Sequence, residues 1–159
     1  TPEEFFIISN KEENIKKTIS CNVETNKKQE LVIMVGFPGS GKTTLTKNFE
    51  KYSNYSILHG DNLKTEAKII KILTKELKNK KSVIIDATNP SIKKRSVFID
   101  IAKKYNIYIR IITMTASMEE SMNRNALREK PIPKIAFYMF RKNYEEPKIC
   151  EGVDEVIIC

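Results

Sequence analysis

The sequence predicts an α/β fold in which five parallel strands are covered by helices on both faces. First, short continuous apolar runs alternate with longer amphipathic stretches, which is typical of a parallel sheet whose strands are joined by helices. Second, 159 residues with 40% apolar content are enough for one domain with a substantial core. Third, no apolar run approaches the ~20 residues of a membrane-spanning helix, so we expect no membrane partner.

The regular alternation begins near residue 31 and divides the chain into two parts. Residues 1–30 are polar and weakly periodic apart from a helix-start pattern at Thr1–Glu4, and we interpret them as an N-terminal arm or linker. Residues 31–159 form the predicted domain. Its five predicted strands are Leu31–Val35, Tyr55–Asp61, Ser82–Ala87, Ile107–Met114 and Val153–Cys159.

A helix is predicted after each of the first four strands, and one more helix precedes the fifth. These helices are Lys42–Tyr52, Asn62–Lys81, Ser91–Tyr105, Ser117–Lys130 and Pro133–Glu146. The face of the second helix that should be buried consists of Ala67, Ile70, Leu73 and Leu77. Core packing, rather than stacking on bases, is expected for the aromatic residues Phe98, Phe137, Tyr138 and Phe140.

The most specific short pattern is GFPGSGKT at Gly36–Thr43, which satisfies G-x-x-x-x-G-K-[ST] between a predicted strand and a predicted helix. Gly39 and Gly41 allow the backbone to curl so that successive N–H groups face phosphate oxygens. Lys42 is expected to reach the β- and γ-phosphates of ATP, and the Thr43 hydroxyl to bind Mg²⁺. The predicted ATP-binding residues are Gly36, Pro38, Gly39, Ser40, Gly41, Lys42, Thr43 and Thr44.

Two carboxylates are predicted at the carboxyl ends of strands, where ligands of parallel sheets bind. Asp61 could accept the proton of an attacking hydroxyl, or it could instead cap the following helix. Asp86 could hold or orient Mg²⁺, or it could simply close its strand before a turn. His59 is the only histidine, and we expect a structural position for it at a strand end.

Missing motifs exclude two classes of nucleotide-binding protein. No Asn-Lys-x-Asp motif for guanine recognition is completed, and the Ser-Gly-Gly signature of ABC-type ATPases is absent. The remaining class is a small kinase, which closes an arginine-bearing lid over the phosphates. Arg124 and Arg128 lie four residues apart on a predicted helix and suit that role. The alternative is a solvent-exposed helix face with Glu119 and Glu120 as partners.

Several longer strings resemble the kinase domain of the polynucleotide kinase 3′-phosphatase family. In chain order they are VGFPGSGKTT, Asp61-Asn62-Leu63, IIDATNPS followed by Arg95, NALRE at Asn125–Glu129, Ile132-Pro133 and YMFRKNYEEPKICEGV. The resemblance covers about residues 30–159, and IIDATNPS and the C-terminal string are more specific than the phosphate loop. TPEEFF at the start resembles the end of that family's phosphatase domain, so this chain is expected to be the kinase half of a longer protein. The phosphatase motif Asp-x-Asp-Gly-Thr is absent.

The resemblance implies a P-loop kinase fold and transfer of the ATP γ-phosphate to a 5′-hydroxyl end of DNA or RNA in strand-break repair. It implies that Asp61 is the general base and that the lid residue is Arg128 or Arg124. It also places Asp86, Asn89 and Arg95 along the active site. The sequence departs from the family pattern at two positions that precede and follow the base, Gly60 and Lys64. Both positions carry arginine in parts of the family, so Lys64 is expected to hold the acceptor's phosphate more loosely.

A basic cluster at Lys93, Lys94 and Arg95 is the predicted acceptor patch, because cations there could contact a phosphate backbone without reading sequence. The net charge of +8 also favours a polyanionic partner, although lysine-rich solvated surfaces would explain both observations. Two other functions stay open: a P-loop kinase of a small hydroxylated metabolite or nucleoside, and a non-catalytic nucleotide-binding module.

The three cysteines are odd in number and widely spaced, which predicts reduced thiols and an intracellular setting. The sequence does not distinguish the nucleus from the cytoplasm.

Overall fold

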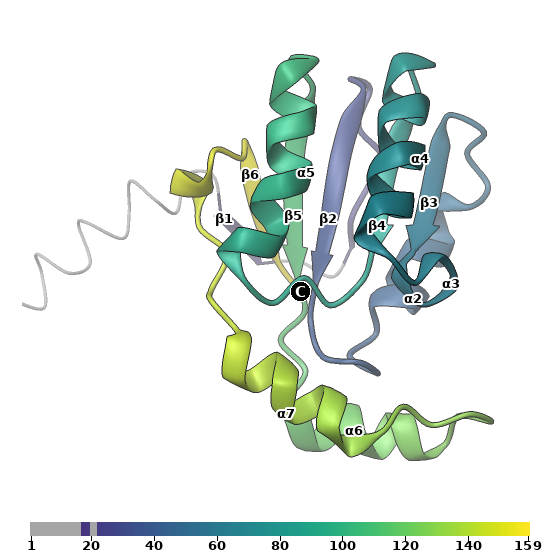
Figure 1. The fold of residues 1–159 in the computed structure, drawn as a ribbon, viewed down its shortest axis with the longest axis vertical. Helices are drawn as coiled ribbons and strands as arrows, with labels where there is room; N and C mark the ends of the chain where they lie inside the picture. Colours follow the sequence, from purple (N-terminus) through teal and green to yellow (C-terminus); the bar gives the residue numbers. More distant parts are fainter. Residues whose placement is uncertain (1–16, 20–21) are drawn as a thin grey trace, which may run out of the picture.

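The computed structural model describes residues 17–19 and 22–159, which form one six-stranded parallel sheet with helices around it (Figure 1). The strand order is β1-β6-β5-β2-β4-β3. The strands are β1 (Lys17–Ile19), β2 (Glu30–Val35), β3 (Tyr55–His59), β4 (Ser82–Asp86), β5 (Tyr108–Thr113) and β6 (Glu155–Ile158). The chain's central strand, β2, pairs in parallel with β4 on one side and β5 on the other.

All five predicted strands are present, and the structure adds β1 at one edge of the sheet. In the described part of the chain this strand pairs with β6 alone, with Lys17 opposite Val156 and Ile19 opposite Ile158. The interpretation of residues 1–30 as a linker is therefore wrong for Lys17–Ile19. A strand of three residues is too short to show a periodic pattern, so the sequence carried no signal for it. The predicted helix start at Thr1–Glu4 and the TPEEFF string lie outside the described residues.

The helices are shorter and more divided than the sequence pattern predicts. They are α2 (Lys42–Thr46), η1 (Lys47–Phe49), α3 (Gly60–Leu63), α4 (Glu66–Lys78), α5 (Ile92–Lys104), α6 (Met118–Ala126), α7 (Lys134–Asn143) and η2 (Ile149–Glu151). The single helix expected at Asn62–Lys81 is broken at Lys64, whose φ of 64° lies in the left-handed region. Thr65 then starts α4 by accepting a hydrogen bond from the Lys68 amide.

The buried face of α4 also differs from the prediction at two of its four residues, because Ile70 is half-buried and Ala67 is not buried. Ile69, Leu73 and Leu77 are buried, whereas Ala67 is exposed. The apolar spacing alone located neither the break at Lys64 nor the buried position of Ile69. Of the four aromatic residues assigned to the core, Phe98, Phe137 and Phe140 are buried, but Tyr138 is exposed.

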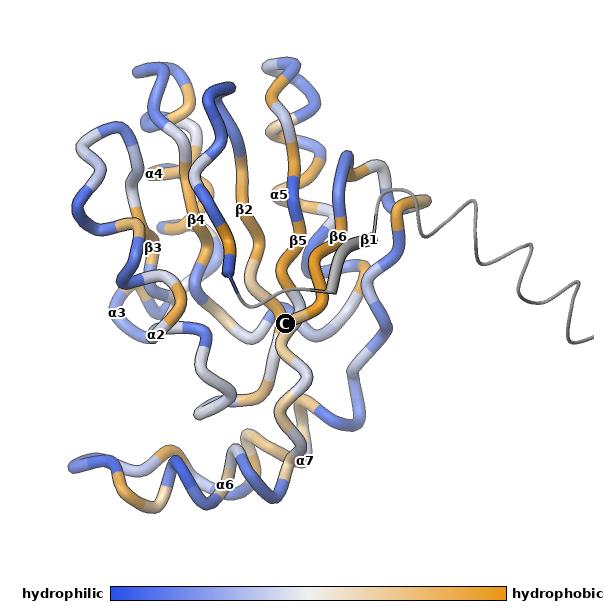
Figure 2. The backbone as a smooth tube through the Cα atoms, turned by 180° about the vertical axis from the view of Figure 1, so that it is seen from behind, coloured by the Kyte–Doolittle hydropathy of each residue, from blue (hydrophilic) through white to orange (hydrophobic). Residues whose placement is uncertain are grey.

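The two faces of the sheet are covered unequally. Helices α4 and α5 lie on one face (Figure 1), where they pack on apolar residues of β2, β4 and β5 such as Ile33, Ile85 and Ile111. On the opposite face, seen in Figure 2, α2, η1 and the chain before β2 cover a smaller cluster that includes Val32, Met34 and Phe49. Helices α6 and α7 lie across the carboxyl ends of the strands (Figure 1). No helix among the described residues has the length and apolarity needed to cross a membrane.

A buried charge cluster lies near the amino ends of the strands. A guanidinium nitrogen of Arg110 donates to Glu30 Oε1 and to the backbone carbonyl of Glu24. The Tyr55 hydroxyl donates to the same Glu30 oxygen at 2.7 Å and accepts from the Asn26 amide. These bonds fix residues 22–29 against the sheet as the chain enters β2.

The cysteines differ from the prediction at one position. Cys150 is free and exposed, whereas Cys159 is disulfide-bonded. The prediction of reduced thiols is therefore wrong for Cys159, and Cys21 lies outside the described residues.

Candidate active site

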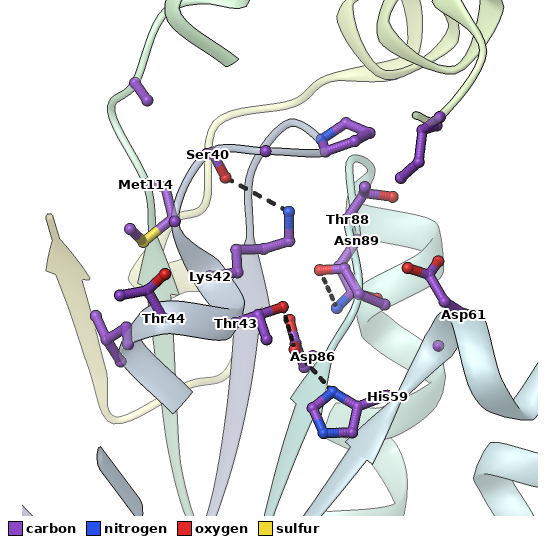
Figure 3. A pocket seen from close by; sticks show the side chains of 18 of the residues that line it. Ser40, Lys42, Thr43, Thr44, His59, Asp61, Asp86, Thr88, Asn89 and Met114 are labelled. Carbon is purple, nitrogen blue, oxygen red and sulfur yellow. Dashed lines mark hydrogen bonds and ion pairs between the residues drawn. The ribbon is translucent and has the colours of Figure 1, made fainter. Parts of the chain in front are cut away.

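A cleft of about 1070 Å³ opens at the carboxyl ends of the strands (Figure 3). Its walls come from the β2–α2 loop, the ends of β3 and β4, the start of α5 and the lid segment that contains α6. Most predicted site residues line it: Pro38, Gly39, Ser40, Gly41, Lys42, Thr43, Thr44, Asp61, Lys64, Asp86, Asn89, Lys94, Arg124 and Arg128. The fold therefore brings together residues that are up to 90 positions apart, from Pro38 to Arg128.

The β2–α2 loop has the backbone shape that its glycines allow. Gly39 and Gly41 have φ values of 78° and 99°, in the left-handed region that side chains disfavour. A methyl group added at Gly39 would lie 2.5 Å from the Ser121 carbonyl oxygen of α6, so the loop also packs against the lid without room for a side chain. The loop ends at α2, whose first residues, Lys42 to Thr44, line the cleft, and the free backbone N–H groups at a helix start suit an anion.

Lys42 is buried, and its ammonium group is held by the loop itself. Its Nζ donates to the carbonyl oxygens of Gly36 at 2.9 Å and Phe37 at 2.6 Å, and lies 3.4 Å from Ser40 Oγ. Burial lowers the pKa of Lys42 to about 8; Asp86 and Asp61 act in the opposite direction, and Arg128 lowers it further. Within the described residues no carboxylate is bonded to this buried cation, which favours the binding of an anion such as a phosphate group.

Asp86 connects two strands and the phosphate loop through one oxygen. Its Oδ2 accepts a hydrogen bond from Thr43 Oγ1 at 2.9 Å and lies 2.9 Å from His59 Nδ1 (Figure 3). The Asp86 side chain is 4% exposed, so these partners satisfy a nearly buried carboxylate. Thr43 and Asp86 thus form a hydroxyl–carboxylate pair next to the phosphate loop, which is the oxygen-only donor set that Mg²⁺ prefers.

Asp61 lies across the cleft from Lys42 on the short helix α3 (Figure 3). It is exposed, and the residue that caps the following long helix is Thr65 rather than Asp61. The alternative explanation of Asp61 as the cap of that helix is therefore excluded. Lys64 lies at the end of α3 and lines the same side of the cleft.

The absence of a side chain at Gly60 has a steric explanation. A methyl group there would lie 2.9 Å from the Ala87 side chain, so the residue before Asp61 fits against the β4–α5 loop only as glycine.

The predicted lid, which consists of α6 and the residues up to Lys130, places two arginines on the cleft. Arg124 is in the last turn of α6, and a methyl group added at Gly41 would lie 3.6 Å from its guanidinium. Arg128 lines the cleft too, but it follows the end of α6 and therefore does not share a helix face with Arg124 as predicted. Asn125 holds this turn by donating to the Ile132 carbonyl and accepting from the Ile132 amide.

The predicted basic acceptor patch is only partly present. Lys94 is exposed and lines the cleft, whereas Lys93 is exposed but lies outside the cleft lining. Arg95 is fully buried: its guanidinium binds both carboxylate oxygens of Glu151 at 2.8 and 3.1 Å and donates to the carbonyls of Asn89 and Glu145. The prediction that Arg95 contacts an acceptor is therefore wrong. Its basic neighbours suggested a surface position, but its partners are distant in sequence.

Asn89 combines a cleft position with a structural one. Its φ is 43°, and its side-chain nitrogen donates to the Met34 carbonyl at 2.8 Å. This bond ties the β4–α5 loop to β2 directly below the phosphate loop.

The contact of His59 with Asp86 was not predicted from the sequence. The two residues end neighbouring parallel strands and are directly paired in register. Aligning the first residues of the two predicted strands, Tyr55 and Ser82, would have paired His59 with Asp86, because paired residues of parallel strands point to the same face.

Comparisons with known proteins match this architecture. The AAA domain family model matches residues 31–147, a range that includes the phosphate loop, both acidic strand ends and the lid. The bifunctional polynucleotide phosphatase/kinase of Schizosaccharomyces pombe is 41% identical over 133 residues, which are 80% of this chain and 33% of the relative. The putative bifunctional polynucleotide phosphatase/kinase of Acanthamoeba polyphaga mimivirus is 31% identical over 183 residues, covering 98% of this chain and 44% of the relative.

A chain of the solved Pnkp1/Rnl/Hen1 RNA repair complex is also similar, with 25% identity and a TM-score of 0.62. The similarity covers 76% of this chain and 45% of that chain. The present chain thus spans less than half the length of these relatives. With the phosphate loop, the acidic strand ends and the lid all inside the matched region, the chain belongs to the AAA domain family.

Proposed function

We propose that residues 31–159 are the kinase domain of a polynucleotide kinase that transfers the γ-phosphate of ATP to the 5′-hydroxyl of DNA or RNA. The observation that carries this proposal is the position of Asp61, an exposed carboxylate across one cleft from the buried ammonium of Lys42. The predicted ATP-binding loop and a candidate general base therefore line the same cleft. The names of the two curated relatives support a polynucleotide as the acceptor.

In the proposed reaction, the 5′-hydroxyl oxygen forms a bond to the γ-phosphorus while the bond from that phosphorus to the bridging oxygen of ADP breaks. Asp61 accepts the hydroxyl proton, and ADP leaves with the electron pair of the broken bond. Lys42, Arg124 and Arg128 stabilise the negative charge on the transferring group from the loop and the lid. The backbone amides of Gly39 to Thr44 bind the remaining phosphate oxygens.

Thr43 and Asp86 would hold Mg²⁺ in this reaction. Their side chains form a hydrogen-bonded pair at the cleft wall, and Mg²⁺ is usually held by one or two protein oxygens together with phosphate oxygens. When bound, the ion would neutralise charge on the phosphates.

The acceptor strand is proposed to enter on the side of Asp61, where Lys64 and Lys94 line the cleft. Their ammonium groups would bind the first phosphodiester groups electrostatically, without reading base sequence. Asn89 lines the same region, whereas Lys93, the neighbour of Lys94 in sequence, lies outside the cleft lining. A protein with this activity works on broken strands, so we propose an intracellular role in strand-break repair, with a phosphatase domain elsewhere in the same protein.

A labelling assay tests the proposal directly. The chain is incubated with [γ-³²P]ATP, Mg²⁺ and matched DNA and RNA oligonucleotides that carry either a 5′-hydroxyl or a 5′-phosphate. Label should appear only on the 5′-hydroxyl oligonucleotides. Label on free nucleosides alone would instead support a small-molecule kinase, and ATP binding without any labelled acceptor would support a non-catalytic module.

A further inference from the structure

The contact between His59 and Asp86 is built into the sheet. His59 is the last residue of β3 and Asp86 the last residue of β4, and the two are paired in register. Nδ1 of His59 lies 2.9 Å from Oδ2 of Asp86. Since both residues end regular strands, neither side chain depends on a mobile loop for its position.

The hydrogen bonds of Asp86 are all on one oxygen. Oδ2 receives both the Thr43 hydroxyl and His59 Nδ1, and among residues 17–19 and 22–159 no side-chain hydrogen bond reaches Oδ1. Two bonds from different directions to the same oxygen fix the rotation of the carboxylate about its Cβ–Cγ bond. Oδ1 is thereby left as the oxygen that a cation, or water bound to it, would use.

The chemistry of the pair determines which of the two atoms carries the proton. A carboxylate oxygen only accepts, so His59 Nδ1 carries the hydrogen and donates it. The His59 side chain is 31% exposed and Asp86 only 4%, so a partly exposed imidazole contacts a nearly buried carboxylate. If the donor on residue 59 were removed, Thr43 alone would orient Asp86, although Thr43 is itself proposed to bind the ion.

We propose that His59 is a positioning residue for the metal-binding carboxylate: it holds Asp86 in the rotation that presents Oδ1 to Mg²⁺. The inference rests on the metal site of the proposed function, and His59 acts only through Asp86. Groups that orient metal-binding carboxylates typically contribute about 10–100-fold to metal affinity.

Three substitutions of His59 separate this role from simple packing. In His59→Asn the amide nitrogen is as many bonds from Cα as Nδ1, so the donor to Asp86 is kept. In His59→Gln the same amide is one carbon farther away, and in His59→Leu the donor is lost. The Asn and Gln variants are a matched pair, because they differ by one methylene group.

The measurement is calorimetric binding of a non-hydrolysable ATP analogue, first in EDTA and then at saturating Mg²⁺. The ratio of the two dissociation constants gives the metal's contribution. We expect equal dissociation constants in EDTA for all four proteins. The Mg²⁺ enhancement should fall about 10–100-fold in His59→Gln and His59→Leu and be retained in His59→Asn.

Two results would overturn the inference. One is an unchanged Mg²⁺ enhancement in all variants. The other is an equal loss in His59→Asn and His59→Gln together with weaker binding in EDTA and a lower melting temperature, which would indicate packing alone. The assay contains no acceptor, so a failure of oligonucleotide labelling in the unaltered protein would remove the proposed acceptor without affecting this result.

Discussion

Buried charges occur at both ends of the sheet. In the described part of the chain, the cation at the amino ends of the strands is ion-paired and the cation at the carboxyl ends is not. At the amino ends, Arg110 is paired with Glu30, whose carboxylate also accepts from Tyr55. Burial opposes the charged form of Arg110, but the hydrogen bond and charge of Glu30 outweigh it, so its pKa is raised. At the carboxyl ends, Lys42 is buried among carbonyl oxygens without an ion pair in the described part of the chain, and its pKa falls to about 8.

The difference separates charges that hold the fold from charges that serve a ligand. The Arg110–Glu30 pair is already neutral, and it anchors the chain entering β2. Lys42 has no bonded carboxylate in the described part of the chain, so phosphate binding in the proposed reaction would recover part of the cost of burying its charge. Substitutions at the two ends should therefore affect different measurements.

The largest expected effect is on catalysis in the cleft at the carboxyl ends of the strands. Asp61→Asn should lower kcat by about 10²–10⁴-fold, because the attacking hydroxyl loses its proton acceptor. ATP affinity and the free energy of unfolding should change little, since Asp61 is exposed. Labelling kinetics, calorimetry and urea denaturation measure the three quantities. Full activity in this variant would mean that another group accepts the proton.

The next largest expected effect is on folding stability, and it concerns the ion pair at the amino ends of the strands. Arg110→Met should lower the free energy of unfolding by about 3–5 kcal/mol, because Glu30 would remain buried without its cation. The double variant Arg110→Met with Glu30→Leu should recover much of this loss, since it buries no unpaired charge. Urea denaturation measures both. A double variant as unstable as the single one would show that the pair contributes more than mutual neutralisation.

An intermediate effect is the pH dependence that Lys42 gives to folding stability and to ATP affinity. Its pKa is lowered in the folded state, so the native protein loses this proton near pH 8 and the unfolded chain only near 10.5. Between these values the contribution of Lys42 to folding stability should rise with pH. Affinity for ATP in EDTA should instead fall above about pH 8, by up to tenfold per unit, because phosphate binds the ammonium form.

Two variants test whether Lys42 causes these opposite trends. Lys42→Met should abolish both. Arg128→Met should move the midpoint of the binding curve to higher pH, because Arg128 lowers the pKa of Lys42. Affinity that stays constant to pH 10 would show that Lys42 keeps its proton in the empty cleft.

The smallest expected effect concerns acceptor binding. Lys64→Ala with Lys94→Ala should raise the KM for oligonucleotides and reduce the slope of log KM against log salt by about one unit per lost phosphate contact. Lys93→Ala is the matched control, because Lys93 is also exposed but does not line the cleft. Equal effects of the control and the double variant would place the acceptor on the outer face of α5.

The strands and the phosphate loop could be predicted because their signals are local. A continuous apolar run such as Leu31–Val35 needs no distant information, and the G-x-x-x-x-G-K-[ST] spacing contains its own backbone requirements. The break in the helix at Lys64 had no such signal, because the residue in the left-handed region is not a glycine. Strand β1 was missed because three residues paired at an edge show no period.

Site residues were predicted correctly as cleft residues where strand ends or motifs placed them, and wrongly where a partner decided the outcome. Arg95 belongs to a basic run, yet Glu151, which is 56 residues away, holds it in the interior. His59 has no neighbouring motif, and only the register of two strands brings it to Asp86. In both cases the sequence shows the residue type but not the distant partner that determines where the side chain lies.

The contact between Gly39 and the Ser121 carbonyl has a mechanical consequence. The phosphate loop and helix α6 touch through main-chain atoms, so no side chain at Gly39 can rearrange to absorb a displacement of either one. A swing of the lid away from the sheet must uncover the loop at the same moment, and a change in loop shape must push on the lid. We therefore expect the shape of the phosphate loop and the position of α6 to be coupled, so that a probe attached to α6 reports when the loop binds phosphate.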